Sequence, residues 1–460
     1  MHTDPQQAYL DANDLLAAGD FAAAEVCYLQ ALALQPWHAA ARANLGYVKE
    51  QQGAAAEAEF HYRQALALIP DHAQLHQNLG VLLLKEKRFA ESEVAMRAAV
   101  DLAPETPAGW NHLGALLACT HREVEGEACY RQALALEPGH ARTQFNLSYL
   151  LLRQARFEEG WRMLDARWQF DRLPLSFDCP FWEGEPLAGK SIVLGLEAGH
   201  GDMIHFVRYA TLLKQRGAAR VDLVCHPALR RLFATLPGVD GVYAPGDPLP
   251  GGWDYWTWPM RLPGLFGTGL ATIPADVPYL RAEPELAAQW RAVLPQHGLR
   301  VGLAWRGNPN FENDADRSLP SLMTLAPLGV AVGAPCESAL HFVSLQKGPG
   351  EAEALQPPAG MSLHAIGPQL GDFAETAAVI ANLDLVICVD TAVAHLAGAL
   401  GKPCWVLLPD YRCDWRWMAD GDDTPWYPSM RLFRQPRGGG WGPVIAEVAA
   451  ALASLGQPLK

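Results

Sequence analysis

The chain has no long hydrophobic run. None of its apolar stretches reaches the length of about 18 residues that a membrane-spanning helix requires. The first residues, MHTDPQQAYL, also lack the basic start and the apolar segment of a secretory signal. We therefore expect no membrane span and a cytoplasmic location.

Basic residues are outnumbered by acidic ones. The 460 residues include 36 lysines and arginines against 50 aspartates and glutamates, which gives a net charge of −14. A nonspecific nucleic-acid partner requires a basic face that displaces counterions from the phosphate backbone. The charge balance therefore argues against nucleic acid as a partner.

Spacings typical of disulfide frames and metal sites are also missing. The nine cysteines are odd in number, scattered and without CxxC spacing, as in a protein that keeps its thiols reduced. No spacing of histidines or carboxylates indicates a metal site, and the acidic segment DGDD at 420–423 is interpreted as a solvated turn. We expect no metal and no other cofactor.

A period of 34 residues dominates the first part of the chain. Proline recurs at this spacing after the similar segments QALALQP, QALALIP, RAAVDLAP and QALALEP, and small residues and glutamates recur with it. A helix-turn-helix period of this length with small residues at fixed points is the tetratricopeptide (TPR) pattern. We predict four full repeats over about 4–139 and a divergent fifth repeat that starts at His140.

One position of the repeat is polar where a core position would be apolar. It is filled by Asn44, Asn78, His112 and Asn146. These residues are either tolerant exposed positions or a ladder on the concave face of the solenoid. Asparagine offers a donor and acceptors, so it can hold a peptide backbone of any sequence. We treat the four as candidate acceptor-binding residues, because inner faces of solenoids commonly bind partners.

The texture of the sequence changes after the prolines at 174, 180 and 186. Strand-like runs now alternate with helical stretches, and SIVLGLE, RVDLVC, RVGLAW, HFVSLQ, DLVICV and CWVLLP are predicted strands. Such alternation builds parallel, doubly wound sheets. We predict an all-α TPR solenoid at 1–170, a linker at 171–189, and Rossmann-like α/β domains at 190–297 and 298–460. The last domain ends in the helix WGPVIAEVAAALASL.

The segment DLVICVDTAVAHLAG places polar residues where a buried strand meets a helix. Ligands of open α/β sheets bind at the carboxyl ends of strands, where free N–H groups and the helix dipole favour a phosphate. Asp390 and Thr391 can also be ordinary N-cap residues, and His395 can be a core histidine. We favour the phosphate role for Thr391 and His395, because they share one face at the end of a strand.

A second junction of this kind follows SIVLGLE, which runs into AGHGD and a helix from about Met203. Gly201 permits close approach of a ligand. Asp202 is placed to cap the helix, and its carboxylate is also a candidate general base. His200 and His205 flank it and remain alternatives for the base.

Two loops of the last domain add cations and amides. AWRGNPNFENDADRS contributes Arg306, Asn308 and Asn310, and Arg306 is either a bidentate phosphate ligand or a surface arginine. SLQKGPG places Lys347 beside a glycine-rich turn. Lys347 is either a point charge for a diphosphate leaving group or a solvated loop lysine.

These segments resemble a known family. IANLDLVICVDTAVAHLAGALGKPCWVLLP and the following DWRWMADGDDTPWYPSMRLFRQ are similar to bacterial TPR-containing glycosyltransferases. The catalytic region of these proteins is similar to the heptosyltransferases of glycosyltransferase family 9 and, more distantly, to the O-linked N-acetylglucosamine transferases of family 41. EAGHGDMIHFVRYATLL, GLAWRGNPNFENDADRS and FVSLQKG resemble further blocks of the family, so the resemblance covers nearly the whole chain.

The resemblance implies a GT-B fold, with the acceptor largely on the first Rossmann-like domain and a nucleotide sugar on the second. It also implies a metal-independent, inverting transfer. By position it makes Asp202 the base, places Asp390, Thr391 and His395 in the diphosphate-binding block, and places Lys347 beside the donor. The chain reads EAGHGD where relatives are expected to read EQGxGD. It therefore lacks the glutamine of this motif and has a histidine, His200, at the variable position.

We therefore expect a glycosyltransferase that moves a sugar from a nucleotide sugar to a protein or peptide recruited by the solenoid. The base takes a proton from an acceptor hydroxyl, and the helix N-terminus, Lys347 and Arg306 stabilise the departing nucleoside diphosphate. Two alternatives stay open. One is a noncatalytic TPR scaffold with a degenerate GT-B domain, and the other is a transferase for a saccharide or lipid-linked acceptor.

Overall fold

A computed structural model describes residues 4–170, 177–330 and 340–455 of the chain. The chain divides into two compact units, Met1–Leu150 and Leu151–Lys460. Residues 171–176 of the predicted linker lie outside the described residues. No helix among the described residues combines the length and the apolar character needed to cross a membrane.

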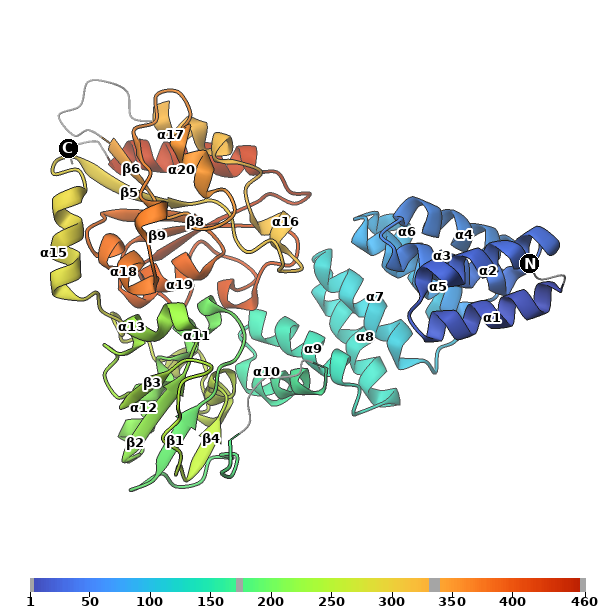
Figure 1. Cartoon of the computed structure of the whole chain (residues 1–460), viewed down its shortest axis with the longest axis horizontal. Helices are drawn as coiled ribbons and strands as arrows, with labels where there is room; N and C mark the ends of the chain where they lie inside the picture. Colours follow the sequence, from blue (N-terminus) through green and yellow to red (C-terminus); the bar gives the residue numbers. More distant parts are fainter. Residues whose placement is uncertain (1–3, 171–176, 331–339, 456–460) are drawn as a thin grey trace. The chain divides into compact units, whose positions relative to one another are not determined.

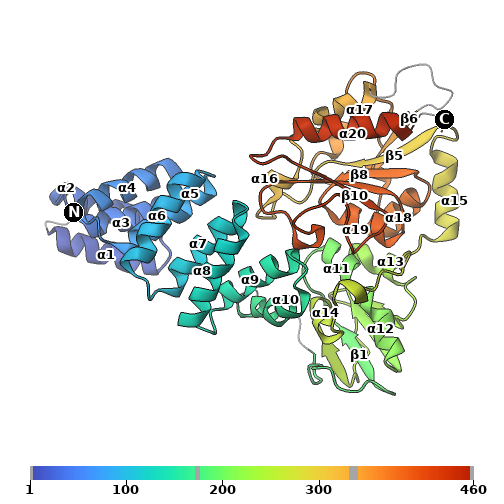
Figure 2. The same cartoon turned by 180° about the vertical axis from the view of Figure 1, so that it is seen from behind.

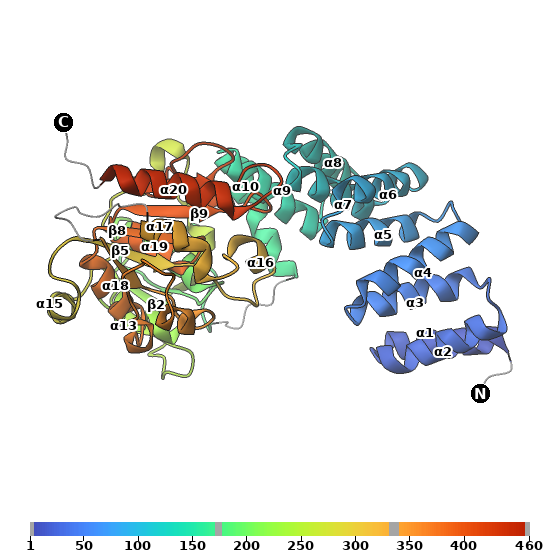
Figure 3. The same cartoon turned by 90° about the horizontal axis from the view of Figure 1, so that it is seen from above.

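The first unit consists of helices that pack as consecutive pairs, and the pairs α1–α2 and α3–α4 can be followed in Figure 3. The helices are α1 Pro5–Ala17, α2 Phe21–Leu34, α3 Ala39–Gln51, α4 Ala55–Leu68, α5 Ala73–Lys85, α6 Phe89–Leu102, α7 Pro107–Cys119, α8 Glu123–Leu136 and α9 Ala141–Arg153. The unit ends within α9. The predicted TPR organisation is confirmed.

Small residues of the repeat lie where the two helices of a pair touch. A Cβ atom added to Gly46 of α3 would lie 2.7 Å from the ring of Tyr62 in α4, and one added to Gly114 would lie 2.8 Å from the ring of Tyr130. The pairs α3–α4 and α7–α8 therefore need a residue without a side chain at this point. The prolines of the period lie two residues beyond the ends of α2, α4, α6 and α8.

The recurring glutamates join neighbouring repeats. Glu59 lies 2.5 Å from the guanidinium of Arg88, and Glu93 lies 2.7 Å from that of Arg122. Each ion pair connects the second helix of one repeat to the start of the second helix of the following repeat. The period is thus visible in surface ion pairs as well as in the core.

The second unit begins with the end of α9, then α10 Phe157–Leu164 and the 3₁₀ helix η1 Asp165–Gln169, and it contains two parallel sheets (Figure 1). The first sheet has the order β3-β2-β1-β4, and the second has the order β10-β9-β8-β5-β6-β7. Their strands are β1 Ser191–Leu194, β2 Arg220–Val224, β3 Gly241–Tyr243, β4 Tyr255–Thr257, β5 Leu299–Ala304, β6 Leu340–Ser344, β7 Leu363–His364, β8 Leu385–Val389, β9 Cys404–Leu408 and β10 Met430–Arg434.

Helices follow most strands and cover the sheets. They are α11 His200–Phe206, α12 Tyr209–Gln215, α13 Arg230–Phe233, α14 Leu262–Leu265, α15 Pro284–Val293, α16 Asp314–Arg317, α17 Ala326–Val330, α18 Phe373–Ala381, α19 Ala392–Ala399 and α20 Trp441–Leu455. The six predicted strands and the predicted C-terminal helix are confirmed. The two sheets with their helices agree with the expected GT-B pair of Rossmann-like domains.

The hydrophobic core around the second sheet explains the apolar sequences of β8 and α20. All five residues of β8 are buried, which accounts for its continuous apolar sequence. Val444, Ile445, Val448 and Leu452 of α20 belong to the same core, so this helix covers the sheet along one apolar face (Figure 3). Residues 331–339 lie outside the description.

The strand order changes direction at two places that matter for binding. β1 lies between β2 and β4, and β5 lies between β6 and β8. Parallel sheets bind ligands at the carboxyl ends of strands at such switch points. The helix after β1 is α11 and the helix after β8 is α19, and these two helices pack against each other (Figures 1 and 2).

Candidate active site

The first turns of α11 and α19 meet at Gly201. A Cβ atom on Gly201 would lie 2.8 Å from Cδ2 of His395, 3.5 Å from Nε2 of His395 and 3.5 Å from Cα of Ala392. The helices therefore approach one another because Gly201 has no side chain. The structure thus brings together the two strand-to-helix junctions that the sequence singled out.

Asp202 lies in the first turn of α11 and is held by two donors. Its Oδ2 atom accepts a hydrogen bond of 3.0 Å from the Gly199 backbone N–H, and its Oδ1 atom lies 2.5 Å from Nη2 of Arg416. Gly199 is the N-cap residue and Asp202 is at the third helical position, so the predicted N-cap role of Asp202 is wrong. The helix begins three residues before Met203, with Gly199 in extended backbone as its N-cap.

Arg416 is a site residue that sequence reasoning missed. Its side chain is 4% exposed, and besides Asp202 it contacts Asp414 at 2.9 Å. It lies in the 3₁₀ helix Trp415–Trp417, inside the tryptophan-rich segment after β9. The segment WRW could have indicated this residue, because an arginine between two tryptophans is placed to be buried with them.

His200 stacks between two aromatic rings. Its ring centroid lies 4.3 Å from that of His226 and 5.2 Å from that of Phe373, with interplanar angles of 24° and 27°. Burial, followed by the charge of His226, lowers the pKa of His200 to about 4. His200 is therefore neutral at pH 7, and its ring joins the first sheet's domain to α18.

His205 is completely buried. Its Nδ1 atom lies 2.9 Å from the hydroxyl of Tyr427, and the same hydroxyl lies 3.0 Å from Nδ1 of His395. Burial, more than the nearby arginines, holds the pKa of both histidines well below the usual range. Tyr427, in a segment without regular pattern, is the second site residue that the sequence did not reveal.

Thr391 and Asp390 occupy the end of β8 as predicted. Thr391 is the N-cap residue of α19, but its hydroxyl makes no capping hydrogen bond, and Oγ1 is buried without a partner among the described residues. Asp390 is 8% exposed. Burial, reinforced by the charge of Asp414, raises the pKa of Asp390 to about 6.

Gln346 holds together the two loops that contain the predicted cations. Its Oε1 atom accepts hydrogen bonds of 2.9 Å from the backbone N–H groups of Trp305 and Arg306. Its Nε2 atom donates to the carbonyl oxygens of Arg306, Lys347 and Pro349. A buried amide with this many partners fixes the ends of β5 and β6 relative to each other.

The predicted cations themselves bind protein groups. Arg306 donates to the carbonyl of Pro320 and lies 3.3 Å from Glu353, while Lys347 donates to the carbonyl of Gly367 at 3.0 Å. The Lys347 side chain is 55% exposed. Asn308 is exposed and accepts a hydrogen bond from the Asn310 backbone N–H. These side chains line the ends of β5 and β6, on the side of the sheet where β8 meets α19.

The four polar residues at one repeat position form some of their hydrogen bonds within the first unit. Asn44 donates to Asn13 at 2.9 Å and to Tyr28 at 3.2 Å, and Asn146 donates to Asn111 at 3.0 Å. Asn78 accepts from Gln74. Each amide keeps further hydrogen-bonding capacity, whereas burial lowers the pKa of His112, the fourth member.

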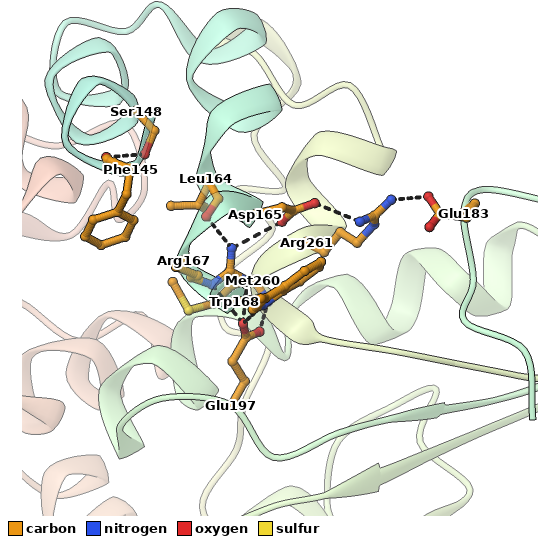
Figure 4. Close-up of polar contacts among 10 residues, drawn as sticks. All are labelled: Phe145, Ser148, Leu164, Asp165, Arg167, Trp168, Glu183, Glu197, Met260 and Arg261. Atoms are coloured by element: carbon orange, nitrogen blue, oxygen red, sulfur yellow. Dashed lines mark hydrogen bonds and ion pairs between the residues drawn. The ribbon is translucent and has the colours of Figure 1, made fainter. Parts of the chain in front are cut away.

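The glutamate of EAGHGD has a structural position. Glu197 is 2% exposed and accepts hydrogen bonds from Arg167, from Trp168 and from the Met260 backbone N–H (Figure 4). Arg167 belongs to η1, so this ion pair attaches the segment after α10 to the first sheet's domain. A cavity of about 700 Å³ lies nearby, but no predicted site residue lines it.

The described residues contain no group of three or more histidine, cysteine, aspartate or glutamate side chains arranged to hold a metal ion. The segment 420–423 is a surface turn, because Asp420, Gly421 and Asp422 are at most partly covered and Arg434 donates to the Gly421 carbonyl.

Three segments of the chain match known protein families. Residues 9–73 and 50–117 match tetratricopeptide repeat models, and residues 346–407 match glycosyltransferase family 9 (heptosyltransferase). The last match begins at Gln346 and includes Lys347, Asp390, Thr391 and His395.

Similar proteins share parts of the chain. The protein FlbA of Caulobacter vibrioides is 28% identical over 365 residues, which are 68% of this chain and 55% of FlbA. The chain thus spans about half the length of the curated relative that it matches. Among solved structures, PilF of Pseudomonas aeruginosa is 19% identical, with 46% of this chain and 85% of PilF covered and a TM-score of 0.36. MamA of Desulfovibrio magneticus RS-1 is 17% identical, with 37% of this chain and 99% of that one covered and a TM-score of 0.34. The family matches thus assign tetratricopeptide repeats to residues 9–117 and glycosyltransferase family 9 sequence to residues 346–407.

Proposed function

We propose that the chain transfers a sugar from a nucleoside diphosphate sugar to an acceptor hydroxyl where the first turns of α11 and α19 meet. The observation that carries this proposal is the close approach of the two turns, in which Gly201, next to Asp202, meets His395 and Ala392, next to Thr391. The turns follow strands at the switch points of two parallel sheets. A donor on one sheet and an acceptor on the other would meet there.

The donor diphosphate is assigned to the N-terminus of α19. The free N–H groups of this helix and its dipole favour negative charge, and the Thr391 hydroxyl is buried without a partner. A phosphate oxygen there would satisfy that hydroxyl. Lys347 and Arg306, from the neighbouring strand ends, would bind the charge that develops on the leaving group by exchanging their present carbonyl partners.

Asp202 is favoured as the general base. Its side chain is 28% exposed, whereas His205 is fully buried with its Nδ1 atom bonded to Tyr427. In the reaction, Asp202 takes the proton of the acceptor hydroxyl as its oxygen attacks the anomeric carbon. The bond from that carbon to the diphosphate breaks, which inverts the configuration. Arg416 and the Gly199 N–H group keep the carboxylate in one orientation.

The acceptor is assigned to a protein or peptide held by the repeats. Asn44, Asn78 and Asn146 are half-buried amides at one repeat position, and each has donor or acceptor atoms beyond its bonds within the unit. Such groups suit a peptide backbone. The partners of this chain would then be a polypeptide and a nucleotide sugar.

The test has two stages. Thermal shifts with UDP, GDP, ADP, CDP and their common sugar conjugates should reveal one stabilising base and sugar, since a ligand at 100 times its Kd stabilises by about 2.7 kcal/mol. Labelled donor is then offered to extracts containing polypeptide, saccharide and lipid fractions. We expect label on polypeptide, and we expect the combined variant Asn44→Ala, Asn78→Ala and Asn146→Ala to lose that label while binding nucleotide normally.

Other outcomes decide between the alternatives. Label on saccharide or lipid that is unaffected by the triple variant would overturn the peptide acceptor and leave the transferase. No stabilisation by any nucleotide, together with no release of sugar from any donor, would show a noncatalytic scaffold.

A further inference from the structure

Two histidines from different sheets share one tyrosine hydroxyl. His205 comes from α11, His395 comes from α19, and Tyr427 lies between β9 and β10. The Tyr427 oxygen lies 2.9 Å from Nδ1 of His205 and 3.0 Å from Nδ1 of His395. His205 and Tyr427 are 0% exposed and His395 is 6% exposed, so the protein covers this arrangement almost completely from bulk solvent.

A single hydroxyl restricts the hydrogen positions. Tyr427 has one hydrogen to donate and lone pairs that accept, and each neutral imidazole has a hydrogen on only one nitrogen. The histidines are neutral because they are buried beside Arg208 and Arg416, and both effects lower the pKa of each ring. When Tyr427 donates to one Nδ1 atom, the other Nδ1 atom must carry the hydrogen that Tyr427 accepts.

The free nitrogen of His205 selects one of these patterns. Nε2 of His205 is buried and has no partner among the described residues. A hydrogen on this atom would be a buried donor without an acceptor, which costs more than a lone pair left alone. His205 therefore carries its hydrogen on Nδ1 and donates it to Tyr427.

The remaining bond is then determined. The neighbouring Tyr279 hydroxyl already donates to the Ile204 carbonyl and accepts from Arg208, so the Tyr427 hydrogen goes to Nδ1 of His395 at 3.0 Å. The hydrogen of His395 is then on Nε2. This edge of the ring faces the first turn of α11, because a Cβ atom on Gly201 would lie 3.5 Å from Nε2. Within the described residues Nε2 of His395 has no hydrogen-bond partner.

We propose that Tyr427 is a positioning residue that fixes His395 with its hydrogen on Nε2, so that His395 donates a hydrogen bond to the donor diphosphate. This inference rests on the proposed function for the identity of the ligand. The hydrogen positions themselves depend only on the geometry above.

A wild-type spectrum tests the hydrogen positions. The full chain is labelled with ¹⁵N-histidine, and long-range ¹⁵N–¹H correlations report which nitrogen of each ring is protonated. The signals are assigned with His205→Gln and His395→Gln. We expect His395 to be protonated on Nε2 and His205 on Nδ1. A hydrogen on Nδ1 of His395 would overturn the proposal, whether or not any variant folds.

A matched pair of variants tests the consequence. Tyr427→Phe removes the shared hydroxyl, whereas Tyr209→Phe removes an equally buried hydroxyl that bonds Thr268. With inorganic pyrophosphate as probe, we expect Tyr427→Phe to raise the Kd about tenfold, the scale of one lost hydrogen bond to a charged group. Tyr209→Phe should stay within about twofold of wild type.

The two results separate the two proposals. Equal pyrophosphate affinity in wild type and Tyr427→Phe would overturn the role of Tyr427. A wild-type chain that binds no pyrophosphate or nucleotide would overturn the donor site of the proposed function, while the spectrum would still decide the hydrogen positions.

Discussion

Arg416 of the second sheet's domain forms an ion pair with Asp202 of the first, with 2.5 Å between Nη2 and Oδ1. The same guanidinium contacts Asp414, so one buried cation is shared by two carboxylates. The orientation of Asp202 therefore depends on both Rossmann-like domains. Separation of the domains would release the candidate base from its partner.

The first prediction concerns Asp202→Asn. Asparagine keeps one acceptor oxygen for the Gly199 N–H group, and Arg416 keeps its ion pair with Asp414, so folding should change little. Transfer should fall by at least roughly a hundredfold, because a general base typically contributes about 10²–10⁴-fold. Nucleotide affinity should hold. Turnover with saturating donor and acceptor, and nucleotide binding by calorimetry, measure the two effects.

His200→Ala and His205→Ala are the comparison variants. Near-normal turnover in Asp202→Asn with loss of turnover in one histidine variant would make that histidine the base. His205→Ala requires a stability measurement as well, because it removes a fully buried ring bonded to Tyr427.

The second prediction concerns Thr391→Val. The Thr391 hydroxyl is buried without a partner, so its replacement by a methyl group of similar shape should leave stability unchanged or higher. Nucleotide affinity should weaken by about 1–3 kcal/mol, the scale of a lost hydrogen bond to a charged group. Chemical denaturation measures the stability, and calorimetry measures the nucleotide affinity. Unchanged binding would remove Thr391 from the donor site.

The third prediction concerns Asp390 and pH. Its pKa is about 6 in the folded chain against an ordinary value of 3.8, so the folded state holds the proton more tightly. The stabilising effect of this proton is present below pH 4 and is lost as the pH rises through 6. At pH 7.5 the ionised carboxylate should cost about 2–3 kcal/mol.

Asp390→Asn should therefore raise the melting temperature at pH 7.5, and the gain should shrink between pH 6 and pH 4. Asp384→Asn is the control, because Asp384 lies just before β8, is 38% exposed in its side chain and pairs with Arg300. A gain that does not depend on pH would contradict the burial argument.

The fourth prediction concerns the buried pair Arg167–Glu197. Glu197→Ala leaves the buried Arg167, which is 5% exposed, with the longer carboxylate contact of 3.2 Å to Asp165, and it should destabilise the second unit by about 3–5 kcal/mol. Glu158→Ala breaks an exposed pair on α10 and should cost less than about 1 kcal/mol. Denaturant unfolding compares the two. Equal effects would show that the buried pair is not an anchor.

The fifth prediction concerns metal. The sequence has no ligand cluster and the resemblance implies a metal-independent transfer, so turnover should persist in excess EDTA. Loss of turnover that magnesium or manganese restores would show that the transfer depends on a metal and would make the acidic segment 420–423 a candidate metal site.

The elements that could be predicted from the sequence are those with a repeated or continuous physical requirement. Each repeat needs a small residue where Gly46 faces Tyr62, so the period is visible along the chain. Strand β8 is buried on both faces, so it is apolar throughout. The short edge strands β3 and β7 have three and two residues, too few for a pattern.

The candidate site was predictable only where a strand leads directly into a helix. Thr391 and Asp202 follow such junctions and were found. Arg416 and Tyr427 come from an irregular segment, and Tyr427 lies 32 residues after the histidine that it bonds. Only the packing of α11 on α19 brings these side chains together, and no local periodicity encodes that packing.

Helix α10 and η1 belong to the second unit, although the 34-residue period extends to them. This division has an evolutionary consequence. Duplication or loss of whole repeats before Leu150 leaves the ion pair of Arg167 and Glu197 untouched, so the number of repeats is free to vary among descendants. The segment of α10 and η1 has no such freedom, because its loss removes Arg167 and leaves the buried Glu197 without its ion-pair partner. Lineages of this protein should therefore differ in solenoid length while α10 and η1 persist.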